Sequence, residues 1–411
     1  MGLIKFEYRK LWNKVSISAL IAFLIFSTLH TFIYLNLQWR TLDGNGEVWE
    51  GLQAFRLLKK ISKDVEGVMD QQYLEGLAED YDSSSEKRYL DINGEHRGFL
   101  GTGGMTKYMF PNYCVNYAYY GPYMTNGNDK IGLDYEFLSS ERSFYDQYKE
   151  SMKEDKLMAN EYGGLFPYSA HQISILEDKI EKVRTPFTVE YYQGIANMLS
   201  WYEIQFPYFL VVPVFSLAGI YAKGSEYGVD ELTLSSKNGR KKDFKAKCIS
   251  GNLFAVTAYL IFVAVLMLEH GSIASLHGWN ASAQVFWYDC IYNITAGGGA
   301  ILQFLGGLFG CIVIANLVMM LSAVTGSGKA GIIAALAILY ALCRFYPSYG
   351  MKKIFNPVCF GNNFVAKDGM FIGEILVPCI CVTFVLALLY ITVFEVSIRS
   401  SAKRYHIGGR R

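Results

Sequence analysis

The stretch AGGGAILQFLGGLFGCIVIANLVMMLSAV, residues Ala296–Val324, decides the fold because it contains no charged residue along its whole length. A helix that crosses about 30 Å of hydrocarbon needs roughly 20 mostly apolar residues. Backbone groups in lipid must be paired internally, so a run of this length predicts a membrane-spanning helix. Similar apolar stretches predict further spans at residues 15–37, 204–222, 248–268, 331–346 and 371–396. The sequence therefore predicts an α-helical polytopic membrane protein with six transmembrane helices.

Charges are distributed unevenly about these spans. Residues 38–203 hold 17 basic and 27 acidic side chains, a net charge of −10, whereas the rest of the chain carries +11. The short basic pieces are residues 1–14, the loop 223–247 and the tail 397–411. Short segments rich in Lys and Arg stay in the cytoplasm, so we expect all three inside, together with both termini. The acidic insert 38–203 is then expected to be extracellular.

The remaining connections follow from the same alternation. Residues 269–295 are expected to form an extracellular loop and residues 325–330 a cytoplasmic turn. Residues 347–370 are expected outside, although they carry three lysines against the charge rule. A short re-entrant or interfacial segment would explain the apolar patch Ile354–Phe360 between those lysines.

The insert is predicted to fold as an extracellular domain that is α-rich, or α+β. Helical spacing recurs in the apolar residues Ala54, Leu58, Ile61, Val65 and Val68. Asp70 is a suitable N-cap for a second helix. Residues Ser139–Met158 and His171–Val183 read as two further helices.

Between these helical stretches lies the tyrosine-rich run Tyr108–Tyr123, which reads YMFPNYCVNYAYYGPY. Tyrosine combines apolar area with a hydroxyl group, which suits a wet surface that recognises a substrate or partner. Tyr117, Tyr119 and Tyr120 are the candidate recognition residues. A tyrosine-rich core or strand region is the alternative interpretation of the same run.

No enzymatic or metal-binding motif is complete in the sequence. Residues Gly326–Lys329 end like a phosphate-binding loop, but Ala323 stands where that motif needs glycine, and Ala330 where it needs Ser or Thr. The six histidines show no metal-ligand spacing. We therefore expect a chain that is not itself an enzyme, with no catalytic residue, metal or cofactor of its own.

The eight cysteines do not indicate a disulfide framework. Only Cys114, Cys290 and Cys359 could face an oxidising exterior, and an odd number cannot all pair. The others fall in or beside predicted spans, where a free cysteine acts as a small apolar residue. Such sparse usage favours a bacterial cell membrane.

The loop after the second span, Tyr221–Lys247, reads YAKGSEYGVDELTLSSKNGRKKDFKAK. A mixed-charge helix of this kind can seat in a groove of a soluble partner, and a solvated basic loop is the alternative. The loop resembles the one found in ABC-2-type permeases, the membrane subunits of ATP-binding-cassette exporters. There an E-Y-x-x-G-T-like stretch precedes Leu-rich residues, S-x-x-x-x-R and a later Lys. The matching positions are Glu226, Tyr227, Leu232, Leu234, Ser235, Ser236, Gly239, Arg240 and Lys247. Val229-Asp230 stands where Gly-Thr is usual.

The first 14 residues place apolar side chains among basic ones, which is typical of an amphipathic helix on the inner membrane surface. A simple extension of the first span is the alternative. The run LIKFEYRKLWNK also resembles the amphipathic connecting helix of the same family, with Glu7 as the recurrent acid. Glu7 and Arg9 are the candidate residues of this interfacial helix.

The resemblance implies a function. Two such chains, or one and a homologous permease, would form the pore in the lipid membrane, and two separate ATPase subunits would hold the ATP and Mg²⁺. The expected ATPase contacts are Glu226, Tyr227, Asp230, Glu231, Ser235 and Arg240. ATP-driven alternating access would move a peptide or another amphiphile outward, and no nucleic acid is an expected partner. The large insert resembles that of members from Gram-positive bacteria.

A different class of function competes with this reading. A membrane-anchored extracellular domain that binds or senses a ligand without transport would also need spans and an exterior insert. Six spans and a patterned inner loop are more than anchoring requires. Co-purification of an ATPase separates the two classes.

Overall fold

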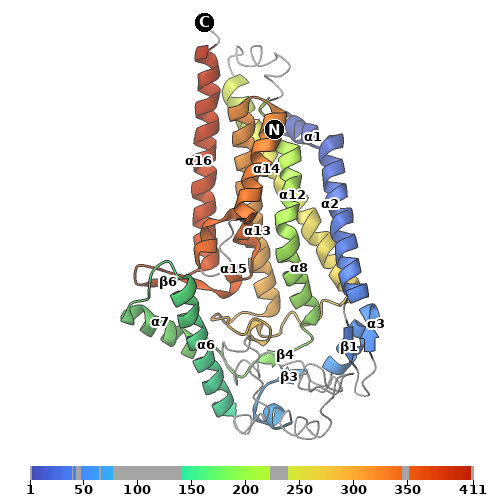
Figure 1. Cartoon of the computed structure of the whole chain (residues 1–411), viewed down its shortest axis with the longest axis vertical. Coiled ribbons are helices and arrows are strands. Elements are labelled where there is room, and N and C mark those ends of the chain that lie inside the picture. Colours follow the sequence, from blue (N-terminus) through green and yellow to red (C-terminus); the bar gives the residue numbers. More distant parts are fainter. Residues whose placement is uncertain are drawn as a thin grey trace.

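The computed structural model describes residues 2–38, 40–42, 48–63, 66–76, 141–222, 239–344 and 351–408. Within these residues the protein is mostly helical, and its long helices lie side by side in an elongated bundle (Figure 1). Four helical stretches are long and apolar enough to cross a membrane, namely Lys14–Leu37, Lys242–Ile273, Ala296–Thr325 and Cys379–Ser401. These four give the chain the architecture of a multi-pass membrane protein.

The bundle contains one long helix for each of these stretches and several shorter ones. Its helices are α1 (Gly2–Leu11), α2 (Lys14–Ile33), which continues as the π-helical turn η1 (Tyr34–Gln38), α8 (Gln193–Phe209), α9 (Val211–Leu217), α12 (Gly239–Ile273), α13 (Ala296–Thr325), α14 (Gly328–Arg344) and α16 (Cys379–Gly408). The predicted spans 204–222 and 331–346 correspond to α8 with α9 and to α14. Both α8 and α14 have 17 residues, fewer than the roughly 20 of a typical span. Pro207 lies inside α8, and only Leu210 separates α8 from α9.

The two ends of the bundle differ in what they carry. We call the end with α1, the start of α12 and the end of α16 the basic end, and the opposite one the insert end (Figure 1). The order of the elements makes α2, α8–α9, α12, α13, α14 and α16 run alternately towards one end and back. The described parts of the insert, the loop 274–295 and residues 369–378 lie at the insert end, and residues 351–361 reach back along α13 to Gly306 and Gly310.

The N-terminal helix is separate from the first long helix. Asn13 caps α2, because its side-chain oxygen accepts hydrogen bonds from Val15 N at 2.9 Å and Ser16 N at 3.2 Å. A side-chain cap of this kind satisfies backbone donors that have no partner within the helix. Helix α1 therefore lies across the end of α2 rather than in line with it (Figure 1), so the first 14 residues are not an extension of the first span.

Aromatic side chains from three helices form the centre of the bundle. Phe209, the last residue of α8, stacks on Phe262 of α12 with ring centroids 5.0 Å apart. Phe23 of α2 contacts both rings. The hydroxyls of Tyr202 and Tyr259 lie 2.6 Å apart. Buried aromatic rings contribute large apolar area and a specific packing geometry, and here they hold α2, α8 and α12 together.

The segment between α14 and α16 folds back onto the bundle. It contains the 3-10 turns η7 (Met351–Phe355) and η8 (Pro357–Gly361), then α15 (Phe364–Lys367). Gly306 and Gly310 of α13 allow the approach of η8, because a Cβ atom would lie 2.2 Å from the Phe360 oxygen and 2.4 Å from the Pro357 oxygen, respectively. The small-residue spacing of α13 therefore serves packing within the chain, as small residues do between membrane helices.

The described strands are short and form three two-stranded antiparallel sheets. They are β1 (Arg40–Leu42) with β2 (Val48–Glu50), β3 (Gly67–Val68) with β4 (Thr188–Val189), and β5 (Gly369–Ile372) with β6 (Ile375–Pro378). All of them lie at the insert end, and β6 leads directly into α16.

Helices predicted in the insert are found, with one correction. Helix α3 (Gly51–Ser62) carries the spacing that begins at Ala54, but Val68 lies in strand β3 rather than in that helix. Gly67 precedes it and disfavours a helix, while pairing with Val189 of β4 satisfies the backbone. The cap at Asp70 is confirmed, because its side chain accepts a hydrogen bond from Tyr73 N at 3.1 Å.

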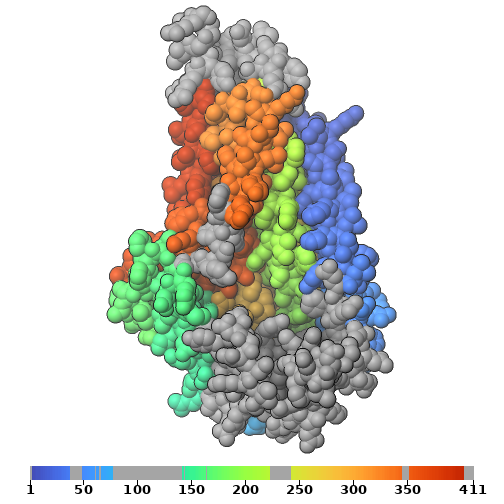
Figure 2. All heavy atoms as spheres, in the orientation of Figure 1, coloured from blue at the N-terminus to red at the C-terminus, as the bar shows by residue number. Residues whose placement is uncertain are grey.

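The other two helices of the insert also match the prediction. They are α6 (Glu141–Gly163) and α7 (Ala170–Glu181), and Ser169 caps α7 in a reciprocal capping box with Gln172. Figure 2 shows these two helices, in teal-green, standing out beside the insert end of the red C-terminal helix. Phe144 and Tyr148 of α6 are fully buried against Phe187 and the loop 274–295.

Candidate functional site

Several predicted site residues lie outside the part of the chain that the structure describes. These are Glu226, Tyr227, Asp230, Glu231 and Ser235 of the basic loop, and Tyr117, Tyr119 and Tyr120 of the tyrosine-rich run. Arg240 belongs to the first turn of α12, but its side chain is not among the described ones. Their predicted roles stay predictions. The residues that flank the basic loop on both sides are described, and their contacts are as follows.

The first end of the basic loop is fixed on α13. The backbone N–H groups of Tyr221 and Ala222 both donate to the Ser322 hydroxyl, at 3.1 Å and 3.2 Å. Ser322 and Ala222 are fully buried. Because these two residues immediately precede residues 223–238, the loop leaves the bundle from a point attached to the last turn of α13.

The second end of the loop is fixed on α12 and α16. Tyr221 donates its hydroxyl proton to the Phe244 carbonyl at 3.2 Å, and their rings stack at 6.0 Å. Arg399 of α16 lies over the Phe244 ring at 5.2 Å and pairs with Glu395 at 3.1 Å. Lys247 pairs with Asp243 at 2.9 Å. These contacts form a joint, hereafter the loop joint, in which both flanks of the loop meet α12, α13 and α16.

Helix α1 adds a further layer at the basic end. Ser250 donates to the Ile4 carbonyl at 2.9 Å, and Tyr8 donates to the Thr257 hydroxyl at 3.1 Å, so α1 is attached along α12. Of the two predicted residues of this helix, Glu7 is buried and lies 3.7 Å from Lys10, whereas Arg9 is exposed. Glu7 therefore belongs to the packed face of α1, and Arg9 to its outer face.

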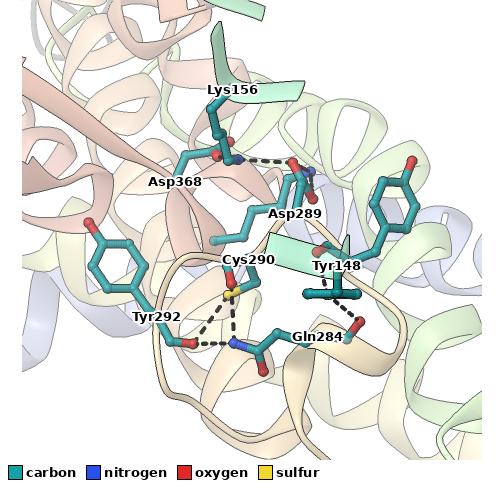
Figure 3. A network of polar contacts seen from close by, with 9 residues as sticks. Tyr148, Lys156, Gln284, Asp289, Cys290, Tyr292 and Asp368 are labelled. Carbon is teal, nitrogen blue, oxygen red and sulfur yellow. Dashed lines mark hydrogen bonds and ion pairs between the residues drawn. The ribbon is translucent and has the colours of Figure 1, made fainter. Parts of the chain in front are cut away.

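A second polar site, which sequence reasoning missed, lies at the insert end (Figure 3). Lys156 of α6 contacts Asp289 at 3.0 Å and also pairs with Asp368. Lys367 contacts both carboxylate oxygens of Asp289 at 2.7 Å. These side chains are mostly removed from water, with 11% of Lys156 and 10% of Asp289 exposed. This charge cluster joins α6 to the loop 274–295 and to the end of α15.

The charges of the cluster shift one another's proton affinity. Burial alone would raise the pKa of Asp289, but Lys156 and Lys367 outweigh burial and hold that pKa well below its usual range. Burial opposes the charge of Lys156, yet Asp289 and Asp368 together keep the pKa of Lys156 well above its usual range. Burial, together with the negative charge of Asp289, raises the pKa of Asp155 to about 6. The pKa of Asp155, the neighbour of Lys156 in α6, thus lies close to neutral pH.

A layer of neutral hydrogen bonds supports the cluster (Figure 3). Gln284 donates to the carbonyls of Cys290 at 3.1 Å and Tyr292 at 2.8 Å, which closes the loop around its side chain. Tyr148 of α6 donates to the Gln284 carbonyl at 3.3 Å. Burial raises the pKa of the Cys290 thiol to about 12, so this thiol stays protonated and inert at neutral pH.

Contacts within the chain account for two of the lysines that break the charge rule in residues 347–370, one of them through the cluster. Lys367 is neutralised by Asp289, and Lys353 lies over the Phe364 ring at 5.6 Å. The sequence signal was an isolated Asp289 between aromatic residues and a lysine at Lys367 on the side expected to be outside. The pairing of Lys367 with Asp289 could not be predicted from the sequence, because 78 residues separate them along the chain.

Among the described residues, these polar side chains have structural roles, and we find no arrangement of them typical of a catalytic or metal-binding site. Among them, no group of three His, Cys, Asp or Glu side chains could hold a metal ion. Their cysteines are all free, and Cys290 and Cys359 are buried; Cys114 lies outside the described residues. Of the residues Gly326–Lys329, the first two form the turn that joins α13 to α14 and the last two begin α14. What the geometry does provide is mechanical attachment at both ends of the bundle.

Comparison with known proteins assigns no relative, since no family model, curated protein or solved structure matches this chain.

Proposed function

We propose that the chain is the permease subunit of an ABC-2-type exporter, with six spans, cytoplasmic termini and an extracellular insert. The four long apolar helices support membrane insertion. The alternating direction of α2, α8–α9, α12, α13, α14 and α16 supports two further spans at α8–α9 and α14. The basic end carries the positive excess, which supports its placement in the cytoplasm.

The loop joint is the observation that carries the proposal. A loop that serves only as a solvated connection needs no fixed ends, yet both flanks of residues 223–238 are held by buried or half-buried contacts. A soluble partner that pushes on the loop would therefore move α12, α13 and α16 together. Movement of packed helices against one another is how bundles of this kind switch states.

Helix α1 would extend this coupling along the membrane surface. Its attachment to α12 through Ile4 and Tyr8 means that a tilt of α12 displaces α1 as well. Exposed Arg9 and Lys10 would face lipid headgroups while apolar side chains face the hydrocarbon. The chain itself would catalyse no bond change, since ATP hydrolysis would take place on two partner subunits.

The insert end would receive the same motion. The charge cluster ties α6 of the insert to α15, and η8 packs on α13, so a shift of α13 is passed to the exterior domain. This arrangement suits a substrate that is gathered outside the bundle or in the membrane, such as a peptide or another amphiphile. A second permease copy or a homologue would complete the pore.

The proposal is tested by isolating the tagged chain from its native membranes and assaying Mg²⁺-dependent ATP hydrolysis in the eluate. We expect ATPase activity to elute with the wild-type chain and to fall in Glu226→Ala and Arg240→Ala at unchanged expression. Lys182→Gln, which removes an exposed ion pair of the insert, is the matched control and should leave the activity unchanged. A wild-type chain that elutes without ATPase activity would overturn the exporter proposal in favour of a sensor.

Topology is tested separately by cysteine labelling. In a background in which Cys114 and the exposed Cys343 and Cys381 are replaced by serine, Ser84→Cys should react with a membrane-impermeant thiol reagent on intact cells. Lys329→Cys, at the exposed start of α14 at the basic end, should react only after lysis. The opposite pattern would show that the chain has the inverted topology, and it would contradict the proposed exporter function.

A further inference from the structure

A lateral projection extends from the insert end of the bundle. It consists of the end of α6 from Tyr162 onward, the turn 164–169, α7 and the β5–β6 hairpin, and it stands out to the side of α16 (Figure 1, Figure 2). Gln172 donates to the Gly373 carbonyl at 2.7 Å, and the rings of Tyr168 and Phe371 lie 5.1 Å apart. Asn160 holds the turn, because it donates to the Phe166 carbonyl at 3.1 Å and accepts from Tyr168 N at 3.1 Å. Specific hydrogen bonds and a ring contact therefore hold the projection in one defined conformation.

The projection exposes large apolar side chains. The exposed fractions are 79% for Tyr162, 82% for Phe166, 53% for Ile372 and 69% for Ile375. They come from two segments that are far apart in sequence and are brought together by the contacts of Gln172 and Tyr168. Gathered exposed apolar residues of this kind mark an interaction site, whereas single ones need no explanation.

The position of the projection indicates what covers it. Strand β6 ends at Pro378, and α16 begins at the next residue. The exposed face of α16 starts one turn later with Phe384 and Val385 and continues with Leu388 and Leu389. Ile372 and Ile375 flank the turn of the hairpin, which also carries the exposed Glu374, and β6 leads from them directly into a helix that is long enough to cross the membrane.

Helix α7 of the projection differs in character from its exposed apolar residues. Helix α7 carries Asp178 paired with Lys182 at 2.5 Å, and Glu177 and Glu181 pair with lysines of α6. These charged residues suit water, whereas the exposed ring of Phe166 and the side chain of Ile375 suit a less polar neighbour. Aromatic and apolar side chains beside the end of a span are typical of the boundary between headgroups and hydrocarbon.

We propose that this projection docks on the lipid surface beside α16, with Tyr162, Phe166, Ile372 and Ile375 inserted at the headgroup boundary. The inference rests on the proposed membrane embedding of α16, and it adds a second, peripheral attachment to the spans. Because α6 carries Lys156, the docked projection sets the height of the charge cluster relative to the membrane. The insert would then be held both by the bundle and by lipid.

The test places a small fluorescent amino acid at single positions of the full chain and reconstitutes each variant in nanodiscs. The probe replaces Phe166 or Ile375 on the projection, Asp178 on its charged side, or Leu389 on the exposed face of α16. Fluorescence is compared between nanodiscs made with plain phosphatidylcholine and nanodiscs made with phosphatidylcholine brominated on its acyl chains, because bromine quenches only probes that lie within reach of the lipid.

We expect the bromine-dependent loss of fluorescence to be largest at Leu389, clear at Phe166 and Ile375, and absent at Asp178. If Leu389 is quenched while Phe166 and Ile375 behave like Asp178, the projection stays in water and the lipid-docking inference is overturned. If Leu389 itself is not quenched, α16 does not face lipid, and the membrane embedding on which the proposed function rests fails with it.

Discussion

The two ends of the bundle use charge in opposite ways. At the insert end, Lys156, Lys367, Asp289 and Asp368 are mostly buried and neutralise one another across three segments of the chain. At the basic end, the ion pairs of Lys10 with Glu7, Lys247 with Asp243 and Arg399 with Glu395 each lie within one helix, and the last is half exposed. One end therefore uses charge to join distant segments, and the other pairs its charges within single helices.

This difference indicates that one end of the bundle contributes mainly to stability and the other mainly to contact with a partner. A buried charge that loses its partner cannot be resolvated, so each member of the charge cluster is required by the others. An exposed pair that is broken is simply hydrated, at a cost of about 0–1 kcal/mol. The insert end is thus expected to hold the fold together, while the basic end can change its contacts when a soluble partner binds.

The largest expected effect is that of Asp289→Ala. Removing this carboxylate leaves Lys156 and Lys367 buried beside fewer negative charges, and breaking a buried pair typically costs about 3–5 kcal/mol. We expect a much lower midpoint of thermal unfolding in detergent. Asp178→Ala, which breaks an exposed pair with Lys182, is the control and should change the midpoint little. Equal effects of the two substitutions would abolish the proposed difference between buried and exposed charges.

A smaller effect depends on pH and centres on Asp155. Its pKa is raised from 3.8 to about 6 by burial and by Asp289, with Lys156, Lys367 and Asp368 also facing it. The folded state therefore binds this proton more tightly than the unfolded state, so this group lowers stability above about pH 6 and the loss disappears as pH falls towards 4. Asp155→Asn removes the loss.

Unfolding midpoints at two pH values check this sign. Asp155→Asn should be more stable than the wild type near pH 7.5, and the gap should become clearly smaller near about pH 4.5, where the wild-type carboxyl is protonated in the folded state. Asp289 stays ionised across this window, because its pKa is held well below its usual range. A gap that is unchanged between the two pH values would show that Asp155 is not perturbed.

The smallest effect on stability is expected at the basic end. Arg399→Gln removes the pair with Glu395 and the contact over the Phe244 ring, both at a half-exposed site. We expect about 0–1 kcal/mol of lost stability, together with a clear loss of partner-stimulated ATP hydrolysis. Lys182→Gln should match the small stability change and spare the activity. A loss of stability as large as that of Asp289→Ala would mean that the loop joint is part of the fold rather than a movable contact.

Much of the fold could be predicted from the sequence because its signals are local. An uncharged run such as Ala296–Val324 specifies a helix wherever it is placed in lipid, and α13 has nearly the same bounds. Capping residues act within one turn, so Asp70 could be identified without knowledge of any distant contact. The helix from Ala54 ends earlier than its spacing suggested because strand pairing with Val189, a non-local interaction, takes over at Gly67.

The candidate site was predicted less completely because its parts are joined by contacts across the chain. The sequence could mark Tyr221–Lys247 as a patterned loop, but not that Ser322 fixes its first end or that Arg399 lies over its second flank. The charge cluster was missed, since no rule of spacing connects Lys156 to Asp289.

Sequence by itself determined the long apolar helices, their separation by charged segments and the asymmetry between a basic and an acidic part. These properties follow from composition and local periodicity, which every helix carries in its own residues. Only the tertiary structure decided which charges are buried together, which glycines meet η8 and which apolar side chains gather on the lateral projection. The physical reason is that pairing and packing depend on distances between residues such as Lys156 and Asp368, which the order of amino acids along the chain does not state.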